Sequence, residues 1–233
     1  MPAIVASGLF RRYGRRYALQ GVSFEVTAGA VVMLAGRNGS GKSTLLRVLA
    51  TALRPDGGEA RVLGHDLLRD TEAVRRQTSL LAHRANLYEP LTALENLALH
   101  ARLLGRDTAR GALLERLRQV DLAERADDPV STFSAGMRQR LALSRVLLKD
   151  AQVVLLDEPY GHLDPPGFRL VDLLLESLRG QGRTVLMATH LLARGRALAD
   201  RALLLEAGRL AYAGPAADLK DREGDAPFAE GAL

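Results

Sequence analysis

The sequence predicts an α/β fold with a parallel sheet at its centre, an antiparallel β layer before it and an inserted block of helices. Three observations predict this architecture. Apolar runs at Ala30–Ala35, Val153–Leu156 and Thr184–Ala188 are each followed by glycine or polar residues, as buried parallel strands are. Apolar and polar residues alternate before the first run, which is typical of a half-buried strand. Helical patterns fill residues from about 90 to 150.

The composition restricts the class of protein. With 233 residues, 47% of them hydrophobic, the chain can form one large domain or two small ones. It has no cysteine, which excludes disulfides and thiolate metal sites. No apolar run approaches the roughly 18 residues of a membrane span, and the early arginines are not followed by the apolar stretch of a signal peptide. We therefore expect a soluble, cytoplasmic protein.

The net charge of +5 has two interpretations. A basic surface can bind nucleic acid or an anionic membrane, or it can be a solvated arginine-rich surface. We favour the second, because only Arg11–Arg16 forms a tight basic cluster and aromatic residues make up 4% of the chain, with no tryptophan. No nucleic-acid partner is expected.

A glycine-rich motif follows the first apolar run. Its residues are Gly36, Arg37, Asn38, Gly39, Ser40, Gly41, Lys42, Ser43 and Thr44. A strand, a glycine turn and a helix form the context in which such a loop wraps its backbone N–H groups around a phosphate chain. Lys42 would reach the terminal phosphates, and the Ser43 hydroxyl would ligate Mg²⁺. An ordinary glycine turn is the alternative, which we disfavour because the full pattern is rare by accident.

The segment before this loop predicts the antiparallel layer. Val22, Phe24 and Val26 alternate with polar residues, as in a strand with one buried face. Tyr13 lies upstream and could stack on an adenine ring. By itself, such a tyrosine is more often a partly buried strand residue.

The middle of the chain predicts a strand and then helices. Leu80–His83 has the pattern of a short buried strand that ends in a polar residue. Thr92–Glu95 forms a capping box that opens a helix, and a second helix carries Leu113–Val120. Asp127–Pro129 interrupts the helical pattern. We interpret about 90–150 as an inserted helical subdomain, because no flexible linker flanks it.

A second potential phosphate site lies near the end of this insert. Ser134 is a natural N-cap for a helix over Arg138–Leu148, and Gly136 lies beside it. A serine and a glycine at a helix N-terminus can bind phosphate, although most helices capped by serine bind nothing.

Carboxylates and a histidine follow the later apolar runs. Asp157 and Glu158 end the run that begins at Val153, and His190 follows Thr184–Ala188. Because active-site groups gather at the carboxyl ends of parallel strands, Asp157 fits a Mg²⁺ carboxylate, and Glu158 fits a group that orients or deprotonates water. Ordinary turn chemistry for the two acids and a structural role for the histidine are the alternatives.

The last part of the chain predicts connections and a hairpin. Asp164–Gly167 reads as a rigid turn, because it contains two prolines and a glycine. Leu203–Glu206 and Arg209–Tyr212 flank a turn and predict a hairpin. Residues 221–233 are expected to form a frayed tail.

The order of these motifs resembles the ATP-binding subunit of ABC transporters, over nearly all of residues 3–220. The resemblance implies a RecA-like P-loop NTPase core in a domain of residues 1–220. The matching positions are Tyr13 for adenine stacking, Gly36–Thr44 for the phosphates, Ser134, Ala135 and Gly136 of the signature motif, Asp157 and Glu158, Asp164 of the D-loop, and His190.

The resemblance also implies cofactors and partners. It implies ATP and Mg²⁺, with Ser43 and Asp157 at the metal and with Glu158, His190 and Lys42 as catalytic residues. In this family two subunits bind ATP head-to-tail, so that the signature of one faces the phosphates on the other. We therefore expect a homodimer bound to an integral membrane permease, at the cytoplasmic face of the cell membrane.

The sequence departs from the family pattern at three places. Ala135 replaces a glycine of the signature, and the D-loop reads Gly161-His162-Leu163-Asp164. His83 stands where the family has the glutamine that reports the metal site to the membrane subunit, and a surface histidine without a role is the alternative. His83 and the Ser-Ala-Gly signature resemble the haem exporter ATPase of cytochrome c maturation (the CcmA family), whereas the D-loop fits that subfamily less well.

Three functions compete on the sequence alone. The first is ATP hydrolysis that powers an exporter, with haem as the expected cargo. The second is the ATPase subunit of a drug or lipid exporter. The third is a soluble ABC protein that acts on nucleic acid or ribosomes, which the single cassette and the ordinary insert disfavour. A binding module without hydrolysis is disfavoured by Glu158 and His190.

Overall fold

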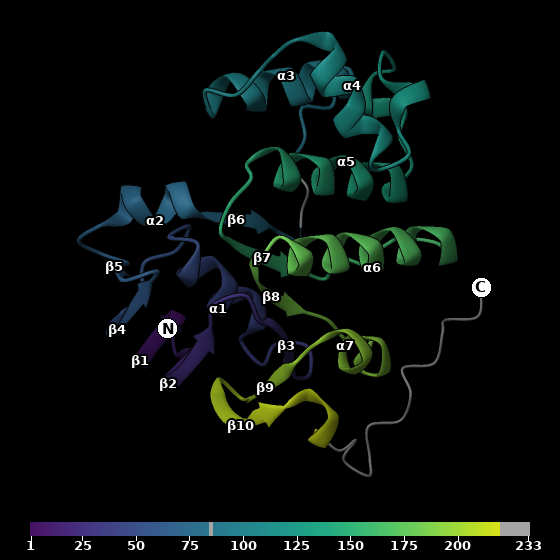
Figure 1. The fold of residues 1–233 in the computed structure, drawn as a ribbon. Helices are drawn as coiled ribbons and strands as arrows, with labels where there is room; N and C mark the ends of the chain where they lie inside the picture. Colours follow the sequence, from purple (N-terminus) through teal and green to yellow (C-terminus); the bar gives the residue numbers. More distant parts are fainter. Residues whose placement is uncertain (84–85, 220–233) are drawn as a thin grey trace.

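The computed structural model describes residues 1–83 and 86–219, in which two sheets pack with helices between and around them (Figure 1). The larger sheet has the strand order β10-β9-β3-β8-β7-β6. Its strands are β3 (Val31–Ala35), β6 (Thr78–Leu81), β7 (Val153–Asp157), β8 (Thr184–Ala188), β9 (Arg201–Glu206) and β10 (Arg209–Pro215). All neighbours are parallel except β9 and β10, which form the expected hairpin.

The smaller sheet is the antiparallel layer that the sequence predicts. Its order is β2-β1-β4-β5, with β1 (Pro2–Tyr13), β2 (Arg16–Thr27), β4 (Gly57–Val62) and β5 (His65–Asp66). Val22, Phe24 and Val26 of β2 are buried, while Ser23 and Glu25 between them are exposed. The alternation therefore does mark the buried face of this strand.

Helices cover the large sheet on both faces. They are α1 (Lys42–Leu49), α2 (Thr71–Gln77), α3 (Ala93–Leu103), α4 (Arg110–Arg118), α5 (Ala135–Leu148), α6 (Pro165–Gly180) and α7 (Leu192–Leu198). Figure 1 shows α3 and α4 beyond α5, so that α5 and α6 lie between that pair and the strands. Thr92 and Glu95 form the expected capping box at the start of α3.

The core is divided by the large sheet into two apolar clusters. Val154 and Leu156 of β7 face the cluster shared with α5 and α6. Val153 and Leu155 face the cluster shared with α1 and the antiparallel layer. Since successive side chains of a strand point to opposite faces, one continuous apolar run fills both clusters. The expected α/β fold with its antiparallel layer is confirmed.

Three local predictions are wrong in detail. Asp164–Gly167 is not an isolated turn but the start of α6, because Asp164 caps that helix and Pro165 takes its first position. Helix α5 begins at Ala135 instead of Arg138. The strand expected at Leu80–His83 ends at Leu81, so His83 lies beyond it.

The proposed division into a domain of residues 1–220 and a tail of residues 221–233 stays a prediction, and the tail lies outside the described residues. Over residues 1–83 and 86–219, no helix has both the length and the apolar character that crossing a membrane requires.

Candidate functional site

The glycine-rich loop connects the end of β3 to the start of α1. Gly36 has a φ of +141°, and a Cβ there would lie 2.3 Å from the backbone oxygen of Leu205 in β9. Only glycine fits this position, because the backbone angle is nearly exclusive to glycine and a neighbouring strand occupies the space. The chain therefore turns sharply between the end of β3 and the start of α1, as a loop that wraps a phosphate chain must.

Two polar groups suit this loop for an anion. The Ser40 hydroxyl is buried, and among the described residues it has no hydrogen-bond partner. The Lys42 ammonium group donates to the backbone oxygens of Gly36 at 2.6 Å and Arg37 at 3.3 Å. Burial lowers the pKa of Lys42, while Glu158 and Asp157 partly oppose the shift. The buried cation and the free hydroxyl fit a phosphate chain bound at the N-terminus of α1.

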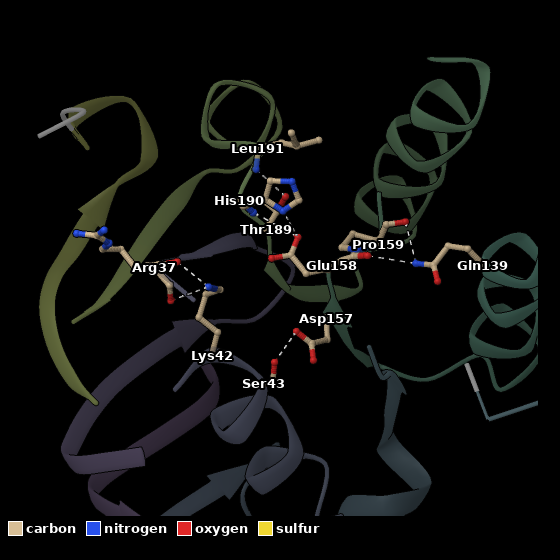
Figure 2. A network of polar contacts seen from close by, with 11 residues as sticks. Arg37, Lys42, Ser43, Gln139, Asp157, Glu158, Pro159, Thr189, His190 and Leu191 are labelled. Carbon is tan, nitrogen blue, oxygen red and sulfur yellow. Dashed lines mark hydrogen bonds and ion pairs between the residues drawn. The ribbon is translucent and has the colours of Figure 1, made fainter. Parts of the chain in front are cut away.

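A candidate position for a metal ion lies beside the loop, at Ser43 and Asp157. Ser43 Oγ donates to Asp157 Oδ1 at 3.0 Å, and the Asp157 residue is 2% exposed. Figure 2 shows this pair beside Lys42, to its lower right in the view. A hydroxyl and a carboxylate supply the hard oxygen ligands that Mg²⁺ takes together with phosphate oxygens. No cluster of three or more His, Cys, Asp or Glu that could hold a metal occurs in residues 1–83 and 86–219, so the loop and its phosphates would have to complete such a site.

Glu158 and His190 meet at the carboxyl ends of β7 and β8. His190 Nδ1 lies 2.8 Å from Glu158 Oε2, and the His190 backbone N–H donates to the same oxygen at 3.3 Å. Glu158 has a φ of +53°, a conformation unusual for a residue with a side chain, and its N–H donates to Ala188. Such strain is retained where the surroundings hold a residue in place. The carboxylate thus points along the sheet edge toward the same side as Lys42 (Figure 2).

Sequence reasoning missed Gln139. This buried side chain of α5 donates through Nε2 to the backbone oxygens of Glu158 at 3.2 Å and Pro159 at 3.1 Å (Figure 2). It therefore links α5, the helix that Ser134 caps, to the strained residue Glu158. A glutamine among apolar positions of an amphipathic helix was the available signal, because a buried amide needs partners.

The signature residues lie at the start of α5. Ser134 caps the helix by accepting a hydrogen bond from the Met137 N–H at 3.2 Å, and both Ser134 and Ala135 are exposed. A Cβ on Gly136 would lie 2.9 Å from the backbone oxygen of His162. Asp164 caps α6 through the Gly167 N–H and also pairs with Arg140. None of the described contacts joins these residues to the glycine-rich loop of the same chain.

The remaining predicted residues lie around the loop or away from it. Tyr13 ends β1, is exposed, and holds the Arg11 guanidinium 5.0 Å from its ring centre. Arg37 and Asn38 are exposed loop residues, and Thr44 is half-buried in the first turn of α1. His83 is exposed, and none of its described contacts reaches Ser43 or Asp157. A further residue, Arg16, was not singled out for the site and donates to the backbone oxygen of Gly39 at 3.3 Å.

Comparison with known proteins gives consistent matches. The family profile described as ABC transporter matches residues 19–161. The daunorubicin resistance ATP-binding protein DrrA3 of Streptomyces coeruleorubidus is 43% identical over 224 residues, covering 95% of this chain and 71% of that protein. The Nod factor export ATP-binding protein I of Ralstonia nicotianae is 34% identical over 210 residues, covering 89% of this chain and 65% of that protein.

Solved structures resemble most of this fold. A dimeric bacterial ABC transporter cassette, MJ0796, superposes with a TM-score of 0.84 at 29% identity, covering 91% of this chain and 98% of that one. A dimeric post-hydrolysis state of the same cassette, bound to ADP and Pi, gives a TM-score of 0.83 at 27% identity, with coverage of 91% and 98%.

Proposed function

This chain belongs to the ATP-binding subunits of ABC transporters, and from that membership we propose that it hydrolyses ATP to drive export of a drug-like small molecule. Members of the family bind ATP with Mg²⁺, pair with a second cassette, and work with a membrane permease at the cytoplasmic face of the membrane. The observation that carries the hydrolytic function is the pair of Glu158 and His190, 2.8 Å apart, beside the loop of Lys42 and Ser43.

The loop binds and orients the nucleotide in this proposal. Backbone N–H groups of Gly36–Thr44 receive the phosphates, and the Lys42 ammonium exchanges its bonds to Gly36 and Arg37 for phosphate oxygens. The Arg11 guanidinium covers one face of the Tyr13 ring, and the adenine stacks on the other face. Mg²⁺, held through Ser43 and Asp157, would neutralise charge on the phosphates.

Glu158 and His190 act on the water in this proposal. The Glu158 carboxylate polarises the water that attacks the terminal phosphate, and His190 fixes the carboxylate through its Nδ1 contact. Gln139 and the Glu158 N–H hold the backbone so that the carboxylate does not turn away. The geometry thus supplies orientation, which is the main requirement of phosphoryl transfer.

The signature residues complete the site of a partner subunit. Ser134 and Ala135 are exposed at the N-terminus of α5, and none of the described contacts joins them or Gly136 to the loop of their own chain, which supports a phosphate on a second cassette as their ligand. Asp164 supports this surface by capping α6 beside Arg140. We place His83 on the side that meets the permease.

The relatives change which cargo we propose. Their names refer to daunorubicin, doxorubicin and Nod factor, which supports the drug or lipid alternative better than the haem exporter suggested by His83 and the signature. We therefore propose a drug-class cargo and do not retain haem as the main hypothesis.

Glu158→Gln tests the hydrolytic site. Glutamine keeps the shape of the side chain but cannot take a proton, so we expect ATP binding without turnover. Because ATP then stays between two cassettes, the variant should shift from monomer to dimer with ATP and not with ADP. Light scattering after size exclusion measures the shift, and a bulky residue at Ser134 should abolish it. Wild-type hydrolysis by Glu158→Gln would remove this residue from catalysis.

The cargo requires a separate experiment. Cells that express the chain with its permease should gain resistance to doxorubicin, and cells with the Glu158→Gln chain should not. Haem loading of periplasmic cytochrome c in the same cells is the competing readout. A change in haem loading without any change in drug resistance would restore the haem hypothesis.

A further inference from the structure

A polar and aromatic cluster lies behind the Glu158–His190 pair. Tyr160 donates its hydroxyl hydrogen to Asp172 Oδ1 of α6 at 2.8 Å. Arg194 of α7 forms an ion pair with the other oxygen of Asp172. The same guanidinium lies 5.7 Å from the ring centre of Tyr160 and 5.2 Å from that of Phe168. The two rings meet edge to face at 5.6 Å.

Burial makes the members of this cluster dependent on one another. The Tyr160 residue is 2% exposed, and burial followed by the hydrogen bond to Asp172 raises the pKa of its hydroxyl, so that it remains a donor. Asp172 accepts from both Tyr160 and Arg194. Removing Tyr160 or Arg194 would therefore take away one of the two partners of Asp172, and removing Asp172 would leave the buried Tyr160 hydroxyl without its described acceptor.

The position of the cluster relates it to the site. Tyr160 stands two residues after Glu158, in the segment whose Gly161 N–H bonds back to the Glu158 backbone oxygen. Arg194 belongs to the helix that begins directly after His190 and Leu191. The cluster thus connects the two chain segments that carry the 2.8 Å contact between Glu158 and His190.

Helix α7 has other attachments, among them Gly195, Arg179 of α6 and a bond from Arg196 to the backbone oxygen of Leu219, and none of these described contacts reaches the segment of Glu158. Gly195 packs against Met33 of β3 so closely that a Cβ there would lie 2.3 Å from the sulfur. Arg179 of α6 bonds to the backbone oxygen of Leu198 and to Asp200 at the far end of α7. The first sets the distance of the helix from the sheet, and the second holds its C-terminus. Arg194 is the attachment that faces Tyr160.

We propose that Arg194, through Asp172 and Tyr160, is a positioning residue that sets the distance between His190 and Glu158. This inference rests on the proposed function, because it assumes that the two residues act together on the attacking water. The described contacts of Arg194 are with Asp172, Tyr160 and Phe168, and none of them reaches the loop of Lys42. Its loss would let α7 shift along the sheet and would loosen the geometry of hydrolysis while leaving the loop of Lys42 intact.

The matched variants are Arg194→Gln and Arg179→Gln: the first removes the ion pair of α7 with Asp172 of α6, and the second removes the ion pair of α6 with Asp200, two residues after α7. We expect Arg194→Gln to lower the kcat of ATP hydrolysis roughly tenfold, because small misplacements of catalytic groups have large kinetic effects. The KM for ATP and the affinity for ADP should stay within about twofold, since the phosphate loop is untouched. Arg179→Gln should lower the melting temperature by about as much as Arg194→Gln does, but it should not change kcat.

Conservative variants separate positioning from simple loss of stability. Arg194→Lys keeps the charge near Asp172 and should recover part of the lost kcat. Tyr160→Phe keeps the ring but removes the hydroxyl bond, and it should give a smaller loss of kcat at unchanged KM. If Arg194→Gln does not fold, these two variants decide the question.

The outcomes distinguish the two hypotheses. An unchanged kcat in Arg194→Gln, or in both conservative variants, would overturn the positioning role, as would an equal loss of kcat in Arg179→Gln. His190→Ala is measured in parallel. If His190→Ala hydrolyses ATP like the wild type, the proposed catalytic pair itself is wrong. If it is inactive while Arg194→Gln is normal, only the positioning role fails.

Discussion

Gly36→Ala should damage nucleotide binding more than its single methyl group suggests. Gly36 has a φ of +141°, and an added Cβ would lie 2.3 Å from the Leu205 oxygen and 2.6 Å from Ser40 Oγ. The strained backbone alone costs about 1–3 kcal/mol. Leu205 is fully buried in β9, so the strand cannot withdraw easily. The loop must therefore move by about 1 Å to restore ordinary contact.

The magnitude follows from that displacement. A shift of about 1 Å in a positioned group can reduce its effect by about a hundredfold, so we expect ATP affinity to fall by that order. A strain of about 2 kcal/mol lowers the melting temperature of a domain of this size by roughly 4–8 °C. Fluorescent ATP titration and thermal unfolding measure the two effects on the same protein.

Gly64→Ala is the matched control for this prediction. Gly64 also has a positive φ, of +84°, but no heavy atom lies within 4 Å of the position of its Cβ. The control should lose some stability from backbone strain and keep its ATP affinity within about twofold. ATP binding by Gly36→Ala at wild-type strength would refute the argument, and so would an equal loss of affinity in Gly64→Ala.

Two further predictions concern histidines. His83→Ala should lower ATPase activity only when the permease is present, and His83→Gln should be tolerated. If the permease in reconstituted vesicles stimulates His83→Ala as strongly as the wild type, this histidine has no coupling role. Burial lowers the pKa of His100 to about 4, and the charges of Arg145 and Lys149 add to the shift. As the pH falls below about 6.5, His100 therefore takes up a proton in the unfolded chain before it does so in the folded chain. The contribution of His100 to folding stability therefore declines as the pH falls from about 6.5 to 4. Between pH 7 and pH 5, the melting temperature of His100→Gln should fall less than that of the wild type. An equal fall in both proteins would contradict the lowered pKa of His100.

The strands of the large sheet could be predicted because burial on both faces makes their sequences almost uniformly apolar. The positions of Asp157 and His190 followed from the same pattern, since polar residues after such runs reach one edge of the sheet. The start of α6 was mistaken for a turn, because proline and aspartate favour both a turn and a helix N-terminus.

The contacts that hold the site could not be predicted in this way. Gln139 reaches Glu158 from another element, and Arg194 reaches Asp172 across 22 positions of the chain. Neither contact leaves a periodic signal, because each depends on how two helices pack against the sheet. A polar residue at a buried helical position predicts that a partner exists without identifying it.

The strand order has a consequence for the synthesis of this protein on the ribosome. Strand β3 pairs with β8 and β9, which are made more than 150 residues later, at Thr184–Ala188 and Arg201–Glu206. The loop that follows β3 packs through Gly36 on the backbone of Leu205. A nascent chain that has emerged only as far as α6 therefore lacks both neighbours of β3 and cannot yet shape its phosphate loop. Because synthesis proceeds at roughly 5–20 residues per second, many seconds pass between the synthesis of β3 and that of its partner strands. During this interval the apolar strand is exposed and can aggregate with other nascent chains.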